Sequence, residues 1–408
     1  MRICVLTIGS EILIGHTVNT NLAFIGDVLA TNGYTVSREV CIPDEPEVIR
    51  TAVQAEIKAA DILITIGGLG PTRDDMTRQI VADTLKRELT VDENLADRIR
   101  QFLEQRHARA DDEQVRNQAA LPAGADPLEN QNGTAPGIWC PWDNGKVVIM
   151  VPGPPRELCP IFTNSVIPRL RKLTPPTTER RMLKICGVPE SVVARQVDEI
   201  LDRKYPALEI AYCARPSVVD VRLTASRRQA AALDAAMAEL EAHFGEAVLQ
   251  KESEDVAEAV ADLLTDKGLR LATAESCTGG GIATRLTERP GASRYLQGSL
   301  VCYVNDWKEK LLGVKSETLQ KHGAVSAETA GEMLDGLLQR DDIDAGIAVT
   351  GIAGPGGGTP DKPVGLVFAA TGVRDRRAVE RYVFPGDRHN VRLRTVAAAL
   401  DQLRRQLL

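Results

Sequence analysis

The first 170 residues alternate short apolar runs with segments whose apolar residues recur every three or four positions. The short runs are rich in β-branched residues and predict buried strands, because they are continuous rather than alternating. These strands are expected at residues 3–8, 35–41, 62–66 and 147–151. Amphipathic helices are expected between them, beginning near Asn21 and Glu45 and around Met76. The pattern predicts a three-layer α/β domain with a mostly parallel sheet over residues 1–172.

The pattern breaks at residues 173–178, where two prolines and small polar residues favour an extended linker. Residues 179–248 then read as strand, helix, strand, strand and an Ala-rich helix. We expect a small α+β module that acts as a spacer or a dimerisation element.

Residues 252–408 return to alternating strands and helices and predict a second, unrelated α/β domain. Ser253 is the expected N-cap of its first helix. Strands are expected at residues 269–273, 300–304, 345–349 and 364–370.

Composition is that of an ordinary soluble protein, with 49 Lys and Arg against 56 Asp and Glu and a formal net charge of −7. That charge, without any basic block, argues against nucleic acid as a partner. The apolar run before Gly9 is too short for a signal peptide, and no later run is long enough to cross a membrane. We therefore expect a cytoplasmic protein. The eight cysteines are dispersed and indicate neither a zinc site nor a disulfide framework.

A glycine-rich loop at residues 67–75 follows one predicted strand and opens a helix. Backbone N–H groups at such a helix start can bind phosphate, and the adjacent carboxylates of Asp74 and Asp75 could hold a divalent cation such as Mg²⁺ or Mn²⁺. The alternative is a tight turn in which both aspartates favour the helix dipole. Two further strand ends, at residues 9–11 and 152–157, are expected at the same edge of the sheet.

Ser276 lies between a predicted strand and a glycine-rich helix start, where a serine hydroxyl can be presented beside N–H groups that stabilise an oxyanion. No histidine is an obvious base, because His322 and His389 are isolated. Lys308 offers the Ser-Lys alternative. The competing interpretation is that Lys308 is one more solvated lysine. Cys277 is a second candidate nucleophile; we prefer Ser276, since neighbouring side chains cannot both point into one site.

Several short motifs together resemble the CinA family of competence/damage-inducible proteins over nearly the whole chain. In the first domain they are GSEIL at 9–13, VNTN at 18–21, GGLGPTRDD at 67–75 and PGPPRE at 152–157. The resemblance implies a molybdopterin-binding-like domain that hydrolyses ADP-ribose to AMP and ribose 5-phosphate with a divalent metal (Mg²⁺, Mn²⁺ or Co²⁺) near Asp74 and Asp75. The nucleotide and phosphate contacts are assigned to Glu11, Asn21, Gly67, Gly68, Gly70, Thr72, Pro154 and Glu157. Asn19 stands where true molybdopterin enzymes commonly have Asp, which weakens a transfer of their chemistry.

In the last domain the motifs are AESCTGG at 274–280, YVNDWK at 303–308, TGIAGP at 350–355 and FPGDR at 384–388. They resemble nicotinamide-nucleotide amidohydrolases, which implies deamidation of nicotinamide mononucleotide (NMN) without a cofactor. The catalytic serine, lysine and tyrosine of that family map to Ser276, Lys308 and Tyr303. Substrate contacts are assigned to Thr278, Gly279, Asn305, Thr350, Gly351, Gly354 and Arg388, with Arg392 as the alternative phosphate ligand. Val304 stands where Ser is frequent and Ser299 where Gly is frequent, and neither change removes a catalytic group.

The leading hypothesis is a bifunctional pyridine-nucleotide salvage enzyme, and the resemblance implies a homodimer. Two alternatives stay open: only the deamidase domain is active, or the chain is a nucleotide-binding regulatory scaffold without turnover.

Overall fold

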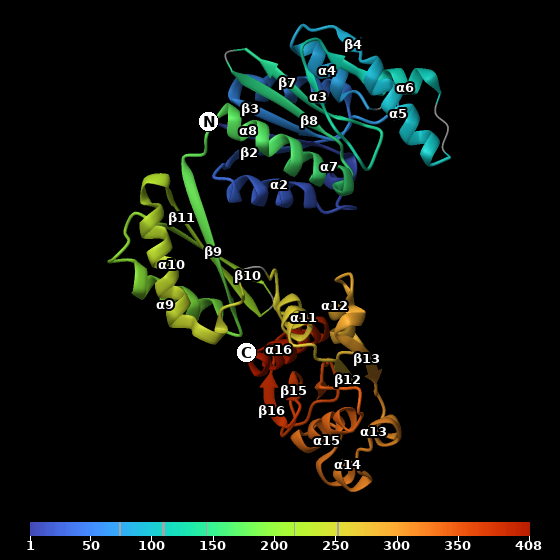
Figure 1. Ribbon diagram of the computed structural model, residues 1–408, viewed down its shortest axis with the longest axis vertical. Coiled ribbons are helices and arrows are strands. Elements are labelled where there is room, and N and C mark those ends of the chain that lie inside the picture. Colours follow the sequence, from blue (N-terminus) through green and yellow to red (C-terminus); the bar gives the residue numbers. More distant parts are fainter. Residues whose placement is uncertain (73–74, 108–110, 144, 216, 251–252) are drawn as a thin grey trace. The chain divides into compact units, whose positions relative to one another are not determined.

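A computed structural model describes residues 1–72, 75–107, 111–143, 145–215, 217–250 and 253–408 (Figure 1). The chain divides into two compact units, one formed by Met1–Arg180 with Ala225–Ala230 and the other by Arg181–Thr224 with Ala231–Leu408. No helix in the described part of the chain is both long and apolar enough to cross a membrane.

The first unit is built on a six-stranded sheet in the order β2-β1-β3-β8-β7-β6. The first four strands in this order pair in parallel, and β7 and β6 add antiparallel to one side. The strands are β1 (Ile3–Ile8), β2 (Val36–Ile42), β3 (Ile62–Ile66), β6 (Asp126–Leu128), β7 (Gly137–Trp142) and β8 (Lys146–Val151). A separate pair joins β4 (Leu89–Val91) to β5 (Ala120–Pro122).

Both faces of this sheet are buried, because alternate residues of each strand enter two different apolar cores. In β1, Val5 belongs to one core and Leu6 to the other. The helices are α1 (Ser10–Leu13), α2 (Thr20–Thr31), α3 (Pro46–Ala59), α4 (Thr77–Thr84), α5 (Glu93–Gln105), α6 (Asp112–Ala119), α7 (Pro155–Ile161) and α8 (Ile167–Leu173), with a π-helical turn at Phe162–Val166. Apolar residues of α2, α7 and α8 fill the core around Val5, and those of α3 and α4 fill the core around Leu6. This arrangement confirms the predicted three-layer α/β fold.

The second unit holds two sheets. A three-stranded sheet has the order β10-β11-β9, and a five-stranded sheet has the order β13-β12-β14-β15-β16. The strands are β9 (Thr178–Cys186), β10 (Glu209–Arg215), β11 (Val218–Ser226), β12 (Leu271–Glu275), β13 (Leu296–Val301), β14 (Ala345–Gly351), β15 (Leu366–Val373) and β16 (Arg376–Val383). The helices are α9 (Glu190–Leu201), α10 (Ala230–Phe244), α11 (Val256–Asp266), α12 (Gly281–Thr287), α13 (Asn305–Leu312), α14 (Ser316–His322), α15 (Ala327–Leu338) and α16 (Arg388–Leu407).

In the five-stranded sheet, β12 pairs in parallel with β13 and β14, whereas β15 and β16 run antiparallel. One face packs on α11, α12 and α16, and the other on α13, α14 and α15. The middle module shares a core with this domain, since Cys186, Val218 and Leu249 lie in one apolar cluster with Val256 and Leu400. The fully buried guanidinium of Arg404 adds a hydrogen bond from Nη2 to the carbonyl of Glu246, at 2.6 Å.

The structure corrects several local predictions. Asp255, not Ser253, is the N-cap of α11, and its carboxylate accepts from the N–H groups of Ala257 and Glu258. Asp255 directly precedes the first helical residue, whereas Ser253 lies two residues too early to reach those groups. The strands predicted at 269–273 and 300–304 are shifted, to β12 and β13, because parallel pairing with β14 and β12 sets their ends. The elements between residues 86 and 146 and the antiparallel edge strand β16 were not predicted.

Candidate functional site

Ser276 follows β12 directly and lies at the carboxyl ends of the parallel strands of the last domain. Its N–H donates to the carbonyl of Val349 in β14, at 3.1 Å, so the neighbouring strand fixes the backbone of the residue. Gly279 and Gly280 have φ values of 59° and 90°, a left-handed conformation that glycine adopts without strain. This turn places Ser276, whose side chain is largely buried, at the start of α12.

Lys308 lies in direct contact with Ser276. Its side chain is only 1% exposed, and its Nζ donates to Ser276 Oγ at 3.1 Å. Nζ also donates to the backbone carbonyls of Cys302, at 2.7 Å, and Tyr303, at 3.2 Å. Burial lowers the pKa of the Lys308 amine, because the charged form loses its hydration. Lys308 is therefore not a solvated lysine; it is a buried amine directed at a serine hydroxyl.

The carboxylate of Glu275 stabilises the turn that follows Ser276, a role that the sequence analysis missed. Its carboxylate is fully buried and accepts from the N–H groups of Ile282, at 3.0 Å, and Ala283, at 2.9 Å. These are first-turn N–H groups of α12 that have no acceptor within the helix. The only local signal was an acidic residue just before a helix start, a few residues earlier than the usual capping position.

Cys277 is disfavoured as the nucleophile. Its thiol is buried with Ala353, Val367 and Val391, and burial raises its pKa to about 11. A thiol with that pKa is protonated at neutral pH and is a poor nucleophile.

Tyr303 and Arg388 lie at the mouth of this site. Tyr303 is 56% exposed, and its hydroxyl accepts from Arg388 Nη2 at 2.8 Å. Arg388 Nη1 donates to the carbonyl of Gly354, at 2.9 Å, and so connects this loop to Tyr303. Among the hydrogen bonds of the described residues, none joins the Tyr303 hydroxyl to Ser276. The structure thus brings Lys308, rather than Tyr303, into direct contact with the serine.

The remaining predicted substrate residues surround the same strand ends. Thr278 is fully buried, and its Oγ1 finds no hydrogen-bond partner among the described residues. The N–H of Gly279 already donates to the carbonyl of Ser276, at 3.1 Å, so it can serve an oxyanion only by sharing or releasing that bond. Thr350 donates through Oγ1 to the carbonyl of Ala324, and Asn305 is exposed at the start of α13.

Two further observations limit the space around this turn. Arg392 donates through Nε and Nη2 to the carbonyl of Thr278, at 3.3 and 2.7 Å, which makes it a support for the turn rather than a free phosphate ligand. A Cβ on Gly351 would lie 2.8 Å from the carbonyl oxygen of Leu366, so a larger residue does not fit there.

In the first domain the three predicted strand ends do gather at one edge. The N–H of Gly67 donates to the carbonyl of Val151, at 3.0 Å, and a Cβ on Gly67 would lie 2.6 Å from the carbonyl of Ile8. Asn21 Nδ2 donates to the carbonyl of Gly153, at 2.7 Å, while its Oδ1 is buried without a partner among the described residues. An unsatisfied buried acceptor at a glycine-lined edge is a feature that a bound ligand can explain.

The glycine-rich loop itself is only partly described. Gly68 has φ 67° and a Cβ there would overlap Thr77 Oγ1, which itself donates to the carbonyl of Gly67. The Asp75 carboxylate accepts from the N–H and the hydroxyl of Thr72, and Gly70 approaches it closely. Asp74, predicted as a metal ligand, lies outside the described residues.

A divalent metal ion needs several oxygen donors around one point. Within them no group of three or more His, Cys, Asp or Glu side chains gathers around one point. Among the described residues of the loop, Asp75 alone supplies a carboxylate, and that carboxylate is already bonded to Thr72. These residues by themselves do not fit a divalent ion, and no step of the chemistry below is routed through one.

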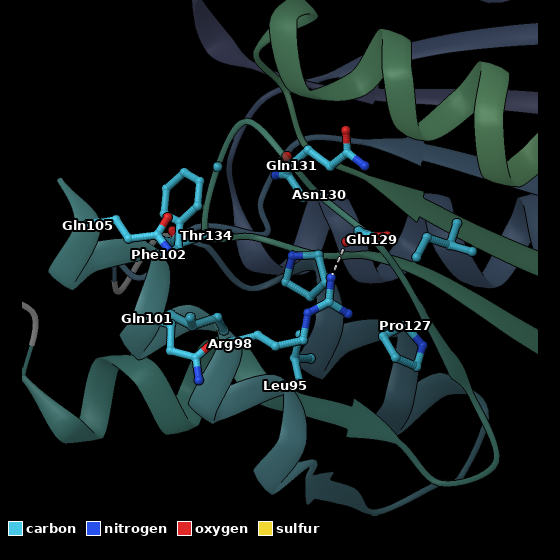
Figure 2. Close-up of a pocket in the computed structure, with 14 residues that line it drawn as sticks. Leu95, Arg98, Gln101, Phe102, Gln105, Pro127, Glu129, Asn130, Gln131 and Thr134 are labelled. Carbon is cyan, nitrogen blue, oxygen red and sulfur yellow. Dashed lines mark hydrogen bonds and ion pairs between the residues drawn. The ribbon is translucent and has the colours of Figure 1, made fainter.

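Glu157 and Pro154 lie where β8 leads into α7, and Glu11 lies in α1. Glu157 is buried and accepts from Asn130 Nδ2 at 2.8 Å, and Gly133 packs directly against its carboxylate. Asn130 and Gly133 also line a cavity of about 320 Å³ between α5 and the segment 127–136 (Figure 2). Figure 2 shows Arg98 directed at Glu129 across this cavity and Phe102 at its edge. The sequence analysis missed this cavity, although Asn130-Gln131-Asn132-Gly133 was a visible polar turn.

Three family models match the chain in succession. They are described as "Probable molybdopterin binding domain" at residues 4–172, "Damage-inducible protein CinA KH domain" at 180–251 and "CinA C-terminal domain" at 253–407. The KH description is new relative to the sequence analysis, which assigned no family to the middle module.

The whole chain is also similar to curated relatives. A protein of Clostridium perfringens (strain SM101 / Type A), whose name places it among competence-damage inducible proteins, is 39% identical over 411 residues, covering 100% of this chain and 99% of the relative. A CinA-like protein of Dictyoglomus thermophilum is 36% identical over 412 residues, covering 100% of both chains.

A solved structure, the competence/damage inducible protein CihA from Agrobacterium tumefaciens, is 45% identical over 37% of this chain and 94% of its own, with a TM-score of 0.36. The full-length identity to the curated relatives and the three matched domain models lead to one conclusion. The chain belongs to the CinA family.

Proposed function

We propose that the last domain is an amidohydrolase that converts NMN to nicotinic acid mononucleotide and ammonia. The observation that carries the proposal is the contact between Lys308 Nζ and Ser276 Oγ, at 3.1 Å, in a site where burial lowers the pKa of the lysine. A buried amine is the kind of base that can remain neutral near physiological pH and activate a serine.

In the first half of the reaction, neutral Lys308 takes the proton from Ser276 Oγ as that oxygen bonds to the carboxamide carbon. The negative charge moves to the carboxamide oxygen, which the N–H groups of the turn after Ser276 stabilise. The Lys308 ammonium then returns its proton to the amide nitrogen, the C–N bond breaks and ammonia leaves. An ester between Ser276 and the nicotinic acid moiety remains.

In the second half, Lys308 accepts a proton from a water molecule whose oxygen attacks the ester carbon. The bond to Ser276 Oγ breaks, Ser276 recovers a proton from Lys308, and nicotinic acid mononucleotide is released. In both halves of the reaction the carbonyls of Cys302 and Tyr303 stabilise the ammonium form of Lys308, because both accept hydrogen bonds from Nζ.

The mononucleotide, rather than free nicotinamide, is supported by Arg388. Its guanidinium lies at the exposed mouth of the site and bonds to the Tyr303 hydroxyl and the Gly354 carbonyl. These are neutral acceptors, which a phosphate can replace with a stronger, charge-assisted interaction. We assign Tyr303 to substrate positioning at this mouth and not to proton transfer.

Incubation of the purified protein with NMN tests the proposal directly. Ammonia and nicotinic acid mononucleotide should form in equal amounts, and replacement of NMN by nicotinamide should slow the reaction. Binding of NMN without release of ammonia would favour the regulatory scaffold and overturn the amidohydrolase.

A second activity, hydrolysis of ADP-ribose by the first domain, is proposed on a separate observation. Asn21 Oδ1, which has no hydrogen-bond partner among the described residues, lies at the edge where the backbones of Gly67 and Gly153 come together. Such an edge suits a phosphorylated nucleotide. Formation of AMP and ribose 5-phosphate from ADP-ribose with added Mg²⁺, Mn²⁺ or Co²⁺ tests this activity. Its absence while deamidation persists would leave the last domain as the active one.

A further inference from the structure

A cavity in the second unit is lined by neither Ser276 nor Lys308 and has no role in the reaction proposed above. Its volume is about 580 Å³, within the range of small-molecule sites. One wall comes from the middle module and includes Pro189, Glu190 and Arg215. The other wall comes from β16, α16 and the segment between them, including Tyr382 and Arg394.

The two walls are held together by buried contacts. Arg404 is fully buried, forms an ion pair with Asp401 at 2.7 Å and donates to the carbonyl of Glu246. Cys186 and Val218 of the middle module lie in one apolar cluster with Leu400 of α16. Because these contacts and the shared apolar core lie next to the cavity, its shape is set by the packing of the unit.

Two charged side chains of the cavity wall, Arg394 and Glu190, have no ion-pair partner among the described residues. Arg215 pairs with Asp220 at 2.7 Å, and Arg405 pairs with Asp401 at 3.3 Å. Arg394, partly buried on α16, has no ion-pair partner among the described residues. A partly buried guanidinium that lacks an anion is best satisfied by a carboxylate or phosphate.

A flat apolar surface lies beside that charge. The rings of Tyr382 and Phe384 both line the cavity and stack at a centroid distance of 5.2 Å and an interplanar angle of 12°. Asn390 adds an amide whose Nδ2 bonds to Asp387, which leaves its oxygen as an acceptor for a ligand. Aromatic faces, one amide and one unpaired arginine together suit a planar heterocycle that carries a single anionic group.

We propose that this cavity binds a nucleoside monophosphate, with the phosphate on Arg394 and the base against Tyr382 and Phe384. One unpaired arginine accounts for one phosphate group. The carboxylate of Glu190, also in the wall, disfavours a longer and more negative polyphosphate.

The two sites occupy different faces of α16. Arg388 and Arg392, four residues apart, bond to Gly354 and Thr278 at the serine site. Asn390, Arg394 and Ala398 recur at the same spacing and line the cavity. The proposal is therefore independent of the amidohydrolase, and its test does not use enzymatic activity.

The test is photolabelling of the full-length protein with 8-azidoadenosine 5′-monophosphate, followed by mass-spectrometric mapping of the labelled peptides. Mapping is needed because the probe can also bind other nucleotide sites of the chain. We expect label in the peptide that contains Tyr382 and Phe384. Unlabelled AMP should compete at least tenfold better than adenosine, since adenosine lacks the phosphate.

Arg394→Gln should reduce this label at least fivefold. Arg381→Gln is the matched control, because Arg381 lies next to Tyr382 on β16, is exposed and does not line the cavity. Leu393→Trp should also block labelling by filling the cavity without removing a charge. Label confined to other peptides, equal competition by adenosine, or full labelling of Arg394→Gln would each overturn the proposal.

Discussion

The serine site of the last domain and the glycine-rich edge of the first domain are both built where parallel strands end, but they are prepared to different degrees. At the serine site the proposed nucleophile and base are already in contact, and the buried Lys308 Nζ donates three hydrogen bonds. At the glycine-rich edge the strand ends come together, while Asp75 is bonded to Thr72 and Asn21 Oδ1 lacks a partner among the described residues. A pair formed by two side chains can be completed by folding alone, whereas a phosphate cradle leaves groups unsatisfied until its ligand binds.

The largest expected effect is the loss of one proposed activity while the other is unchanged. Ser276→Ala or Lys308→Met should lower ammonia release from NMN by about 10³-fold or more, because nucleophile and base act as one unit. ADP-ribose hydrolysis should be unchanged. The measurement is the initial rate of both reactions on the same preparation.

Lys310→Met is the control for Lys308→Met, since Lys310 lies on the same helix, exposed and paired with Asp306 at 2.9 Å. A deamidase that survives Lys308→Met, or loses activity equally in Lys310→Met, would show that the buried amine is not the base.

A change at Asp75 tests the other side of the comparison. Asp75→Asn keeps a side-chain oxygen for the N–H of Thr72 but removes the negative charge, so the loop should persist while the charge at the proposed ADP-ribose site is lost. We expect ADP-ribose hydrolysis to fall about 100-fold and deamidation to be retained. The equivalent change at Asp83, a solvent-accessible residue of α4, should alter neither rate. Unchanged hydrolysis in Asp75→Asn would leave the carboxylate with only its structural bond to Thr72.

The pH dependence of deamidation should report the buried lysine. Only neutral Lys308 accepts the serine proton, so kcat/KM should rise about tenfold per pH unit below its pKa and become constant above it. Because burial lowers that pKa, the plateau should begin at a lower pH than for a solvated lysine. Measurement above pH 7 keeps the substrate phosphate fully ionised. A rate that still rises through the ordinary lysine pKa would contradict a desolvated base.

The smallest expected effect concerns support of the turn. Arg392→Gln removes two hydrogen bonds to the Thr278 carbonyl and should lower kcat about tenfold with little change in KM, because the turn loses its position and not its substrate contacts. Arg394→Gln, on another face of α16, should leave deamidation unchanged. If Arg392→Gln instead raised KM alone, Arg392 would be a substrate ligand. This is the role that the sequence analysis gave it as the alternative ligand of the substrate phosphate.

Much of this architecture was visible in the pattern of residues. The strands β1 and β3 have the bounds predicted for them, since their apolar runs are continuous and their ends are marked by glycine or polar residues. Within residues 86–146, which were not assigned, β4, β5 and β6 are three residues each and carry no periodicity of their own, whereas α5 has an amphipathic pattern that the sequence analysis overlooked. The edge strand β16 was missed for a different reason: its arginine-rich outer face resembles a loop, and only pairing with β15 makes it a strand.

The sequence by itself determined that Ser276, Gly67 and Gly153 follow strands, and therefore that they lie near the carboxyl-end edges of the sheets. The order of apolar and glycine-rich segments is a property of the chain itself, and folding does not change it. Only the tertiary structure decided that the Lys308 amine is buried against Ser276 and that Arg392 supports the turn, that the Cys277 thiol is buried, and that Arg394 lines a cavity. Those properties depend on which neighbours remove water from a group or neutralise its charge, and the neighbours come from distant parts of the chain.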